Sequence, residues 1–408
     1  MGGGQREITL VGRKTLCLAR VCAEVVPKLK MKTRIGILTG GGDCPGLNAV
    51  IRAVVTAAAK NGWTTFGFLG GFEGLLNPVR TRVLDPDEMD GLLFLGGTIL
   101  GTSNSGRFAA KVGHGVAREI DPGIIAEAKG NFDRLGLRAL VVVGGDGSLS
   151  IAQQLHDGGV PVVGVPKTID NDIAGTTVTF GFDTAVSFAT DALDRLRCTA
   201  ASHERVLVCE MMGRYAGWIA AHSGIAGGAD AILIPEIPFS IQRVCDKIQE
   251  REQDGKRHSL VVVAEGARQQ GGEFVTLEQP SAGSGPGGGA FREARLGGVA
   301  TMVADEIQKR TGKETRVCVL GHLQRGGVPT TFDRLLCTRF GVGAVRLISE
   351  ERFGVMVAYI PPDTVGIPLP EAIGRLSTVP PDGDIIRTAR ALGISFGDTI
   401  TPAKAIAA

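Results

Sequence analysis

The sequence is organised around Ala139-Leu140-Val141-Val142-Val143-Gly144-Gly145-Asp146-Gly147-Ser148. Its short, valine-rich apolar run predicts a strand buried in a parallel sheet. Glycines and one aspartate follow, and Ser148 is expected to cap a helix over residues 149–155. Because glycine has no side chain, the backbone there can approach a phosphate closely. Asp146 is then placed to hold Mg²⁺ against that phosphate.

A second polar cluster lies just downstream, in Pro166-Lys167-Thr168-Ile169-Asp170-Asn171-Asp172. Two carboxylates, a lysine and a hydroxyl so close together suit a reacting centre. Either cluster alone could equally be a solvated turn. Both directly follow a predicted strand, and this repetition favours a ligand site.

Composition limits the classes of protein that this chain can belong to. The 408 residues can bury a large core, and the formal net charge is +2. Near-neutral charge argues against a general nucleic-acid or membrane-surface partner. No apolar run is long enough to cross a bilayer. The sequence therefore predicts neither nucleic acid nor membrane as a partner.

Eight cysteines are scattered along the chain, without a C-x-x-C pair. This spacing gives no support to a zinc site or a thioredoxin-type site. Cys44, Cys209 and Cys318 fall in or beside predicted core segments, so we expect small buried residues rather than nucleophiles. A reducing cytoplasm is the natural setting for such a chain.

Predicted strands and helices alternate along the whole sequence, which indicates an α/β protein with parallel sheets flanked by helices. A strand at 34–39, a glycine loop at 40–46 and a helix at 47–60 open the pattern. Further strands are expected at 64–69, 205–210, 231–234, 260–264 and 316–320, and further helices at 121–135, 183–201, 240–253 and 332–350. Residues 270–290 are polar and glycine-rich, which indicates a flexible insertion.

Polar residues follow most of the predicted strands, where parallel sheets bind their ligands. The set comprises Gly42, Asp43, Asp146, Asp170, Arg214, Glu265, His322 and Arg325. A hydroxyl-rich loop at 96–107 is a further candidate for a phosphate or nucleotide contact. Alternatives remain for three of these predictions: His322 as a polar residue at a strand end, Glu265 as a helix-start carboxylate, and Arg205 as the partner of a surface acid.

Six motifs, in the family's order, resemble those of the 6-phosphofructokinases over about residues 32–343. They are residues 38–48 (Leu38 to Asn48), 144–148, 166–172, 202–205, 212–214 and 320–327. The resemblance implies two Rossmann-like domains. It also implies glycolytic transfer of a phosphoryl group from ATP to the 1-hydroxyl of fructose 6-phosphate, giving fructose 1,6-bisphosphate and ADP. The expected division is an extension at 1–30, a donor domain at 31–180, a sugar domain at 181–350 and a C-terminal tail at 351–408.

The same resemblance assigns roles to individual residues. Asp170 resembles the general base and Asp146 the Mg²⁺ ligand; Thr168, Asp172 and Arg214 complete the expected catalytic group. The expected donor contacts are Gly41, Gly42, Asn104, Ser105, Arg107, Gly145, Gly147, Ser148 and Lys167. The expected sugar contacts are Ile169, Met212, Gly213, Glu265, Leu323 and Gln324. A clamp on the 6-phosphate is expected from Arg205, Arg316, His322 and Arg325, because arginine binds phosphate bidentately.

Two residues bear on whether the phosphoryl donor is ATP or pyrophosphate. Gly147 after the metal aspartate is typical of ATP-using members, whereas Lys167 is typical of pyrophosphate-using ones. The pair resembles the ATP-dependent branch close to the pyrophosphate enzymes. A pyrophosphate-dependent enzyme is the alternative. A catalytically weak sugar-phosphate sensor is a third hypothesis, because Asn104 stands where the family has an arginine, with Arg107 three residues on.

The resemblance further implies a homo-oligomer, most simply a tetramer and otherwise a dimer, in which Arg205 and Arg316 complete a neighbour's sugar site. Arg52 matches one of two effector-binding arginines of allosteric relatives, but Thr56 replaces the other. The sequence therefore does not identify the allosteric effectors.

Overall fold

The computed structural model describes Met1 and residues 32–103, 106–108, 119–278, 281–282, 291–292 and 295–399. The chain divides into residues 1–32 and residues 33–408, and the second unit contains every element given below. The expected extension at 1–30 lies, apart from Met1, outside the described residues. Among those that are described, no helix is both long enough and apolar enough to cross a membrane.

An eight-stranded sheet forms the first lobe, in the order β16-β15-β5-β4-β1-β2-β3, with β6 paired to β5. Its central strands are parallel, and β3 and β16 run antiparallel at the edges. The strands are β1 (Arg34–Thr39), β2 (Thr64–Phe68), β3 (Thr81–Leu84), β4 (Leu137–Gly144), β5 (Val162–Thr168), β6 (Phe180–Gly181), β15 (Val355–Ile360) and β16 (Asp363–Pro368).

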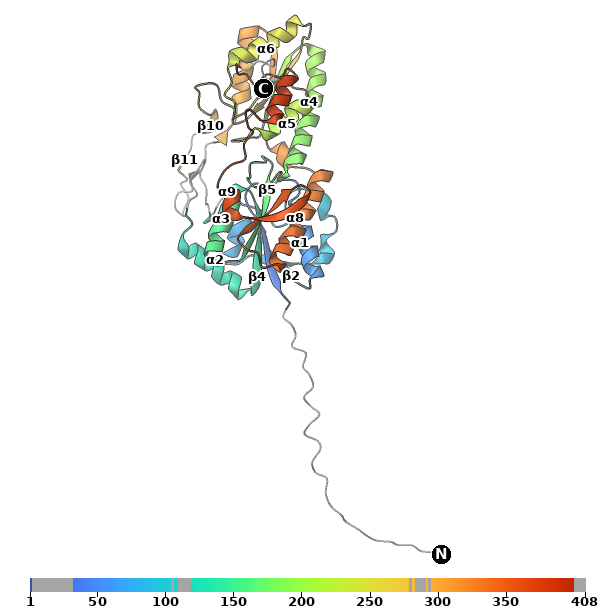
Figure 1. Cartoon of the computed structure of the whole chain (residues 1–408), viewed down its shortest axis with the longest axis vertical. Coiled ribbons are helices and arrows are strands. Elements are labelled where there is room, and N and C mark those ends of the chain that lie inside the picture. The colour runs from blue at the N-terminus through green and yellow to red at the C-terminus, as the bar shows by residue number, and fades with distance from the viewer. Residues whose placement is uncertain are drawn as a thin grey trace. The chain divides into compact units, whose positions relative to one another are not determined.

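Helices cover both faces of this sheet. α1 (Leu47–Lys60) and α8 (Thr331–Ser349) lie together on one face, and α2 (Pro122–Arg134), α3 (Asp146–Asp157) and α9 (Leu369–Ile373) lie on the other (Figure 1). Short 3₁₀ turns, η1 (Gly71–Leu75), η2 (Pro86–Met89) and η3 (Leu92–Phe94), connect the elements near β2 and β3. Strand β4 is buried along almost its whole length, as expected for a strand with helices on both sides.

A parallel four-stranded sheet forms the second lobe, in the order β14-β7-β9-β8. Its strands are β7 (Val206–Met211), β8 (Ala231–Leu233), β9 (Ser259–Ala264) and β14 (Thr315–Val319). One face packs on α4 (Phe182–His203), α5 (Trp218–Ala226) and α10 (Asp384–Ala391), and the other on α6 (Ile241–Gln253) and α7 (Val299–Thr311). The 3₁₀ turn η4 (Gly321–Arg325) follows β14.

The structure confirms the α/β class and nearly all of the expected elements to within one or two residues, and it corrects four details. The described part of the expected tail, residues 351–399, is more than a closing segment, because β15 and β16 extend the first sheet. Two strands of the expected insertion pair antiparallel with strands just beyond residue 290, β10 (Thr276–Glu278) with β13 (Arg295–Leu296) and β11 (Ser281–Ala282) with β12 (Phe291–Arg292). Cys318 is half-buried rather than buried. Helix α3 begins at Asp146 with Gly145 as its N-cap, so Ser148 lies inside the first turn and is not the cap.

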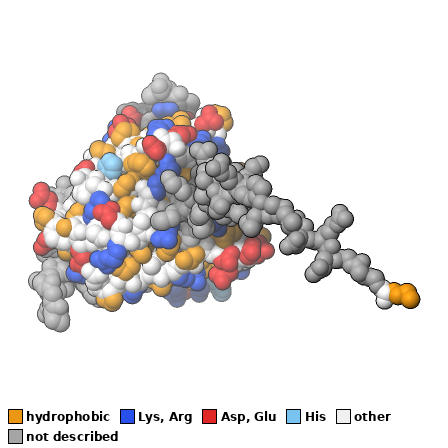
Figure 2. Space-filling model, turned by 90° about the horizontal axis from the view of Figure 1, so that it is seen from below, with side chains coloured by type: hydrophobic (Ala, Val, Ile, Leu, Met, Phe, Trp, Pro, Cys, Tyr) orange, Lys and Arg blue, Asp and Glu red, His pale blue; other side chains and the backbone are white. Residues whose placement is uncertain are grey.

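The expected domain boundaries stay a prediction. Two helices, however, pack outside the domain to which their place in the sequence assigns them. Helix α8, which falls within 181–350, packs on α1 of the first lobe. Helix α10, which falls within 351–408, packs beside α5 in the second lobe. Figure 2 shows one face of the molecule, on which basic and acidic side chains are interspersed, in keeping with the formal charge of +2.

Candidate active site

Two glycine-rich loops meet at the carboxyl ends of β1 and β4, which are neighbours in the sheet. Ser148 fills their junction: a Cβ on Gly40 would lie 2.7 Å from its Oγ, and a Cβ on Gly144 would lie 2.2 Å from its Cβ. Thr102 Oγ1 donates a hydrogen bond of 2.5 Å to the Gly41 carbonyl. The loops are therefore fixed by packing that only glycine permits.

Helix α3 starts at this junction and presents its N-terminus. Asp146 and Gly147 occupy its first turn and are half-buried. The N-terminal amides and the helix dipole make this end favourable for an anion. A Cβ on Gly145 would lie 3.2 Å from the Lys167 carbonyl, so the helix start is also held close to the end of β5.

Lys167 lies at the end of β5 and is 4% exposed. Its ammonium group donates to the Gly42 carbonyl. Burial lowers its pKa, and Arg325 lowers it further, while Asp170 and Asp172 raise it. The lysine thus joins the loop after β1 to the acidic turn that follows β5.

The turn after β5 carries both aspartates of the second sequence cluster. Asn171 adopts a left-handed backbone with φ of 53°, and its Oδ1 accepts a hydrogen bond of 2.9 Å from the Thr179 amide. The Asp170 amide donates to Thr168 Oγ1 at 3.1 Å. Asp170 Oδ1 is buried and has no hydrogen-bond partner among the described residues. A buried acceptor left unsatisfied in this way is a position where a ligand group fits.

The carboxyl groups here have raised pKa values. Burial raises the pKa of Asp170, while Arg325 and Lys167 lower it. Burial, Asp170 and Asp146 raise the pKa of Asp172 to about 7. Since desolvation and like charges disfavour the ionised form, the cluster favours a cation or a proton donor as its partner.

The second lobe contributes the loops that follow β7 and β9. The Glu265 amide donates to the Met211 carbonyl at 2.8 Å, and the Gly266 amide donates to the Gly213 carbonyl at 3.1 Å. A Cβ on Gly266 would lie 1.9 Å from the Arg214 carbonyl oxygen. Burial is the largest cause that raises the pKa of Glu265 to about 7. These backbone contacts fix Glu265 beside the 212–214 loop.

Arg325 of η4 connects the two lobes. Its Nη1 donates to the Asp43 carbonyl at 3.2 Å, and its charge lowers the pKa of both Asp170 and Glu265. Its neighbours in η4 differ in exposure, because Gln324 is buried whereas His322 and Leu323 are exposed. Arg325 is thus the member of the expected clamp that faces the acidic cluster.

The C-terminal segment also supports the acidic turn, which the sequence did not indicate. The Ser377 amide donates to the Asp172 carbonyl at 2.9 Å, and Trp218 Nε1 donates to the Ser377 carbonyl at 2.9 Å. Both contacts join residues far apart in the chain, so no local pattern could have revealed them.

Two of the expected clamp residues lie elsewhere. Arg205 precedes β7 and Arg316 lies at the start of β14, so both are at the opposite strand ends from Arg214 and Arg325. Arg205 Nε lies 2.7 Å from Glu314 Oε2, and Arg316 also pairs with Glu314. This observation matches the alternative of an arginine paired with a surface acid.

The expected donor loop is described only in part. Asn104 and Ser105 lie outside the described residues. Arg107 Nη1 lies 3.1 Å from Glu127 Oε2, and its Nε lies 3.7 Å from Glu73 Oε2. Arg107 is therefore held by two carboxylates.

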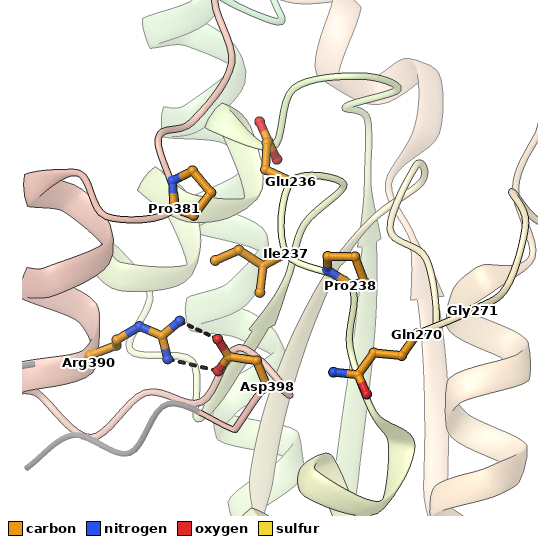
Figure 3. A pocket seen from close by; sticks show the side chains of 8 residues that line it. All are labelled: Glu236, Ile237, Pro238, Gln270, Gly271, Pro381, Arg390 and Asp398. Atoms are coloured by element: carbon orange, nitrogen blue, oxygen red, sulfur yellow. Dashed lines mark hydrogen bonds and ion pairs between the residues drawn. The ribbon is translucent and has the colours of Figure 1, made fainter. Parts of the chain in front are cut away.

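A separate pocket of about 480 Å³ opens in the second lobe, near the end of β8. Figure 3 shows the paired Arg390 and Asp398 side chains on one side of it, with Ile237, Pro238 and Pro381 nearby. The described residues that line it include none of the site residues predicted from the sequence. We assign the site to the strand ends, because the polar groups gather there.

The described residues contain no cluster of three or more His, Cys, Asp or Glu side chains that could hold a metal. Mg²⁺ needs no such cage, because it usually binds one or two carboxylates together with substrate phosphates and water. Asp146 lies close enough to Asp172 to raise its pKa. These carboxylates fit that manner of binding.

Comparisons with known proteins agree with this geometry. The family model described as phosphofructokinase matches residues 34–348, and the chain belongs to this family. An ATP-dependent 6-phosphofructokinase of Chloroflexus aurantiacus is 52% identical over 369 residues, which cover 90% of this chain and 99% of the relative. A pyrophosphate–fructose 6-phosphate 1-phosphotransferase of Amycolatopsis methanolica is 49% identical over 352 residues, 86% of this chain and 97% of the relative.

A solved structure with the same fold is the phosphofructokinase of Pichia pastoris in the T-state. It aligns with a TM-score of 0.72 at 32% identity and covers 85% of this chain. The chain spans 36% of the length of that protein.

Proposed function

We propose that the protein is an ATP-dependent 6-phosphofructokinase that transfers the terminal phosphoryl group of ATP to the 1-hydroxyl of fructose 6-phosphate. Family membership and the ATP-dependent relative support this activity. The observation that carries it is the buried, unsatisfied Asp170 Oδ1, whose carboxyl lies near enough to Arg325 and Lys167 for both charges to lower its pKa. A coupled assay with fructose 6-phosphate, Mg²⁺ and either ATP or pyrophosphate tests it, and no turnover with either donor would contradict it.

The residues divide the chemistry as follows. Asp170 takes the proton of the attacking hydroxyl, and its raised pKa makes it a stronger base near the operating pH. The α3 N-terminus and Lys167 orient the donor phosphates. Arg214 stabilises the charge of the transferring group. Glu265 accepts hydroxyl groups of the sugar, and Arg325 binds its phosphate.

Mg²⁺ is proposed as the metal cofactor, held by Asp146 and the donor phosphates. When bound, it neutralises phosphate charge during transfer. The neighbouring Asp172 carboxyl has its pKa raised in part by Asp146, so a cation at this position would relieve the repulsion between them. A titration that adds EDTA and then restores Mg²⁺ should abolish and then recover turnover.

The choice of ATP over pyrophosphate rests on Gly147 in the first turn of α3. An acidic side chain at this position would crowd and repel the donor, whereas glycine leaves room for the α-phosphate and ribose. Lys167 and the pyrophosphate-using relative favour the alternative donor. Gly147→Asp should lose ATP activity, and a wild-type enzyme active with pyrophosphate alone would overturn the assignment.

We also propose a homo-oligomer, most simply a tetramer, in which Arg205 and Arg316 bind the sugar phosphate of a neighbour. Within one chain, the six residues of β7 separate Arg205 from the 212–214 loop by roughly 20 Å at about 3.3 Å per residue. The adjoining surface carries exposed Val317, Val319 and Leu323, which suits a contact with a second copy.

Complementation tests this arrangement. Asp170→Asn and Arg205→Ala oligomers, each inactive, are mixed under conditions of verified subunit exchange. Shared sites predict partial recovery, because some sites then combine an intact Asp170 with an intact Arg205. Exchange without recovery would mean that each chain builds its whole site alone.

A cytoplasmic location in glycolysis is the proposed setting. The six described cysteines are all free thiols, in keeping with a reducing compartment. Fractionation with markers for each compartment tests the location.

A further inference from the structure

Strands β7 and β14 place two cysteines side by side. Cys209 and Cys318 are directly paired in the parallel register of the two strands. Cys209 belongs to the hydrophobic cluster that packs on α4 and α5, and Cys318 packs against the same cluster. The alternate residues Val206 and Val208 belong to the cluster on the other face. Both thiols therefore lie on one face of the sheet.

The spacing of the two residues suits a covalent bond. Neighbouring strands lie about 4.8 Å apart, which falls within the Cα separation of roughly 4.4–6.8 Å found in disulfides. The Cβ atoms must approach to about 3.8 Å, so the strands have to draw together slightly. Strand β14 can make this adjustment, because it lies at the edge of the sheet and pairs, among the described strands, with β7 alone.

The two thiols differ in burial and in pKa. Cys209 is fully buried, whereas Cys318 is half-buried. A hydrogen bond between the thiols lowers the pKa of Cys318 to about 6. The same hydrogen bond raises the pKa of Cys209, and burial raises it further. Cys318 is consequently the nucleophile, and Cys209 is the resolving thiol.

We propose that Cys209 and Cys318 form a reversible disulfide in the presence of hydrogen peroxide and that this bond weakens fructose 6-phosphate binding. The Cys318 thiolate attacks peroxide, so that an S–O bond forms, the O–O bond breaks and hydroxide leaves. Cys209 then attacks the sulfenic sulfur, so that the S–S bond forms and the oxygen leaves as water. Two thiols and one peroxide thus give one disulfide and two waters, and a dithiol reductant reverses the change.

The disulfide can affect sugar binding because each of the two strands leads into a loop of the candidate site. Strand β7 leads into the loop with Arg214, and β14 leads through Leu320 into η4 with Arg325. The Leu320 amide donates to the Glu210 carbonyl at 3.0 Å, so the ends of the two strands are also joined. Drawing the strands together therefore moves Arg325, which is proposed to bind the phosphate of the sugar, and the loop that carries Arg214. This part rests on the proposed function, whereas disulfide formation does not.

Other described cysteines lack these features. Cys44 and Cys337 are buried, and burial raises the pKa of Cys44 to about 12. Such thiols are poor nucleophiles near neutral pH. Cys198 is exposed on α4 and serves as a matched control for surface oxidation.

The experiment treats the intact enzyme with hydrogen peroxide, alkylates the remaining thiols and maps peptides by mass spectrometry without reduction. The peptides that contain Cys209 and Cys318 should be linked. The KM for fructose 6-phosphate should rise about fivefold or more, the lower end of typical coupling between sites, and dithiothreitol should restore it. Cys198→Ser should behave like wild type, whereas Cys318→Ser should show neither the link nor the KM change.

Thermal unfolding checks that Cys318→Ser is folded, and Cys318→Ala serves as a second variant if it is not. Peroxide treatment without a 209–318 link would overturn the disulfide. A link that leaves KM unchanged, or an equal KM rise in folded Cys318 variants, would overturn the coupling. Turnover of the reduced enzyme, measured first, reports separately on the proposed function.

Discussion

The two ends of the parallel strands β14, β7 and β9 in the second lobe differ in how their charged groups are satisfied. At the carboxyl ends, burial raises the pKa of Glu265 to about 7, and the nearby Asp170 Oδ1 is buried without a described partner. At the amino ends, Arg205 and Arg316 share the Glu314 carboxylate, and the two arginine side chains are 27% and 56% exposed. The first end faces one buried acceptor without a described partner, Asp170 Oδ1, which a ligand would complete. The second end is electrostatically satisfied at the surface by the Glu314 pairs.

The largest expected effect is at the carboxyl end, for Asp170→Asn. Loss of the proposed general base should lower kcat by about 10²–10⁴-fold, while the KM values for both substrates change little. Steady-state kinetics measure this effect, with the exposed Asp254→Asn as the control. A near-normal kcat would remove Asp170 from the base role.

Gly266→Ala should come next. The new Cβ would lie 1.9 Å from the Arg214 carbonyl oxygen, so the 212–214 loop must shift. A displacement of about 1 Å at a reacting group can cost on the order of 10²-fold in kcat/KM. The control is Gly130→Ala on α2, where a Cβ would meet no heavy atom within 4 Å apart from the backbone of its own helix.

The control variant Gly130→Ala should itself change the free energy of unfolding. Removing a glycine from a helix interior should stabilise the protein by about 0.5–1 kcal/mol in urea unfolding. Equal losses of activity in both glycine variants would show that the close approach to Arg214 does not matter.

A smaller effect is expected from Glu265, whose ionisation should make both stability and fructose 6-phosphate binding depend on pH. Burial, Asp170 and Glu210 raise its pKa from 4.5 to about 7, against the opposing charges of Arg214 and Arg325. Between these values the folded protein holds a proton that the unfolded chain has released. The resulting stabilisation is therefore present below about pH 4.5 and lost as pH rises through about 7.

Two measurements follow for Glu265→Gln. The unfolding temperature of wild type relative to the variant should fall between about pH 5 and pH 8. The wild-type KM for fructose 6-phosphate should fall as the Glu265 carboxyl ionises near pH 7. In the variant the KM should change little over the same pH range. An unchanged KM profile would place Glu265 outside sugar binding.

The smallest effect is expected at the amino end. Arg316 is more than half exposed, so Arg316→Ala should change the free energy of unfolding by less than about 1 kcal/mol. Arg310→Ala, which removes a comparable pair with Glu306, is the matched control. Only Arg316→Ala should also raise the KM for fructose 6-phosphate. A large loss of stability in urea unfolding would instead make the Glu314 pair structural.

The helices and strands that local patterns predicted were found nearly at their expected bounds, because apolar periodicity and glycine positions report directly on buried strands and turns. The patterns also located the loops that hold Asp146, Asp170, Glu265 and Arg325, since parallel strands end at a common edge. Patterns failed for Ser148, where packing between Gly40 and Gly144 outweighs its preference for a capping position.

The sequence by itself therefore determined the alternation of elements, the sheet edge at which the candidate site lies and the chemical types of its residues. Tertiary structure alone decided that β15 and β16 complete the first sheet, and that Ser377 supports the Asp172 turn. It also set Cys209 beside Cys318 and put Arg205 and Arg316 at the end away from Arg325. These features depend on register and on contacts between residues distant in the chain, and no local propensity encodes the pairing of one strand with another.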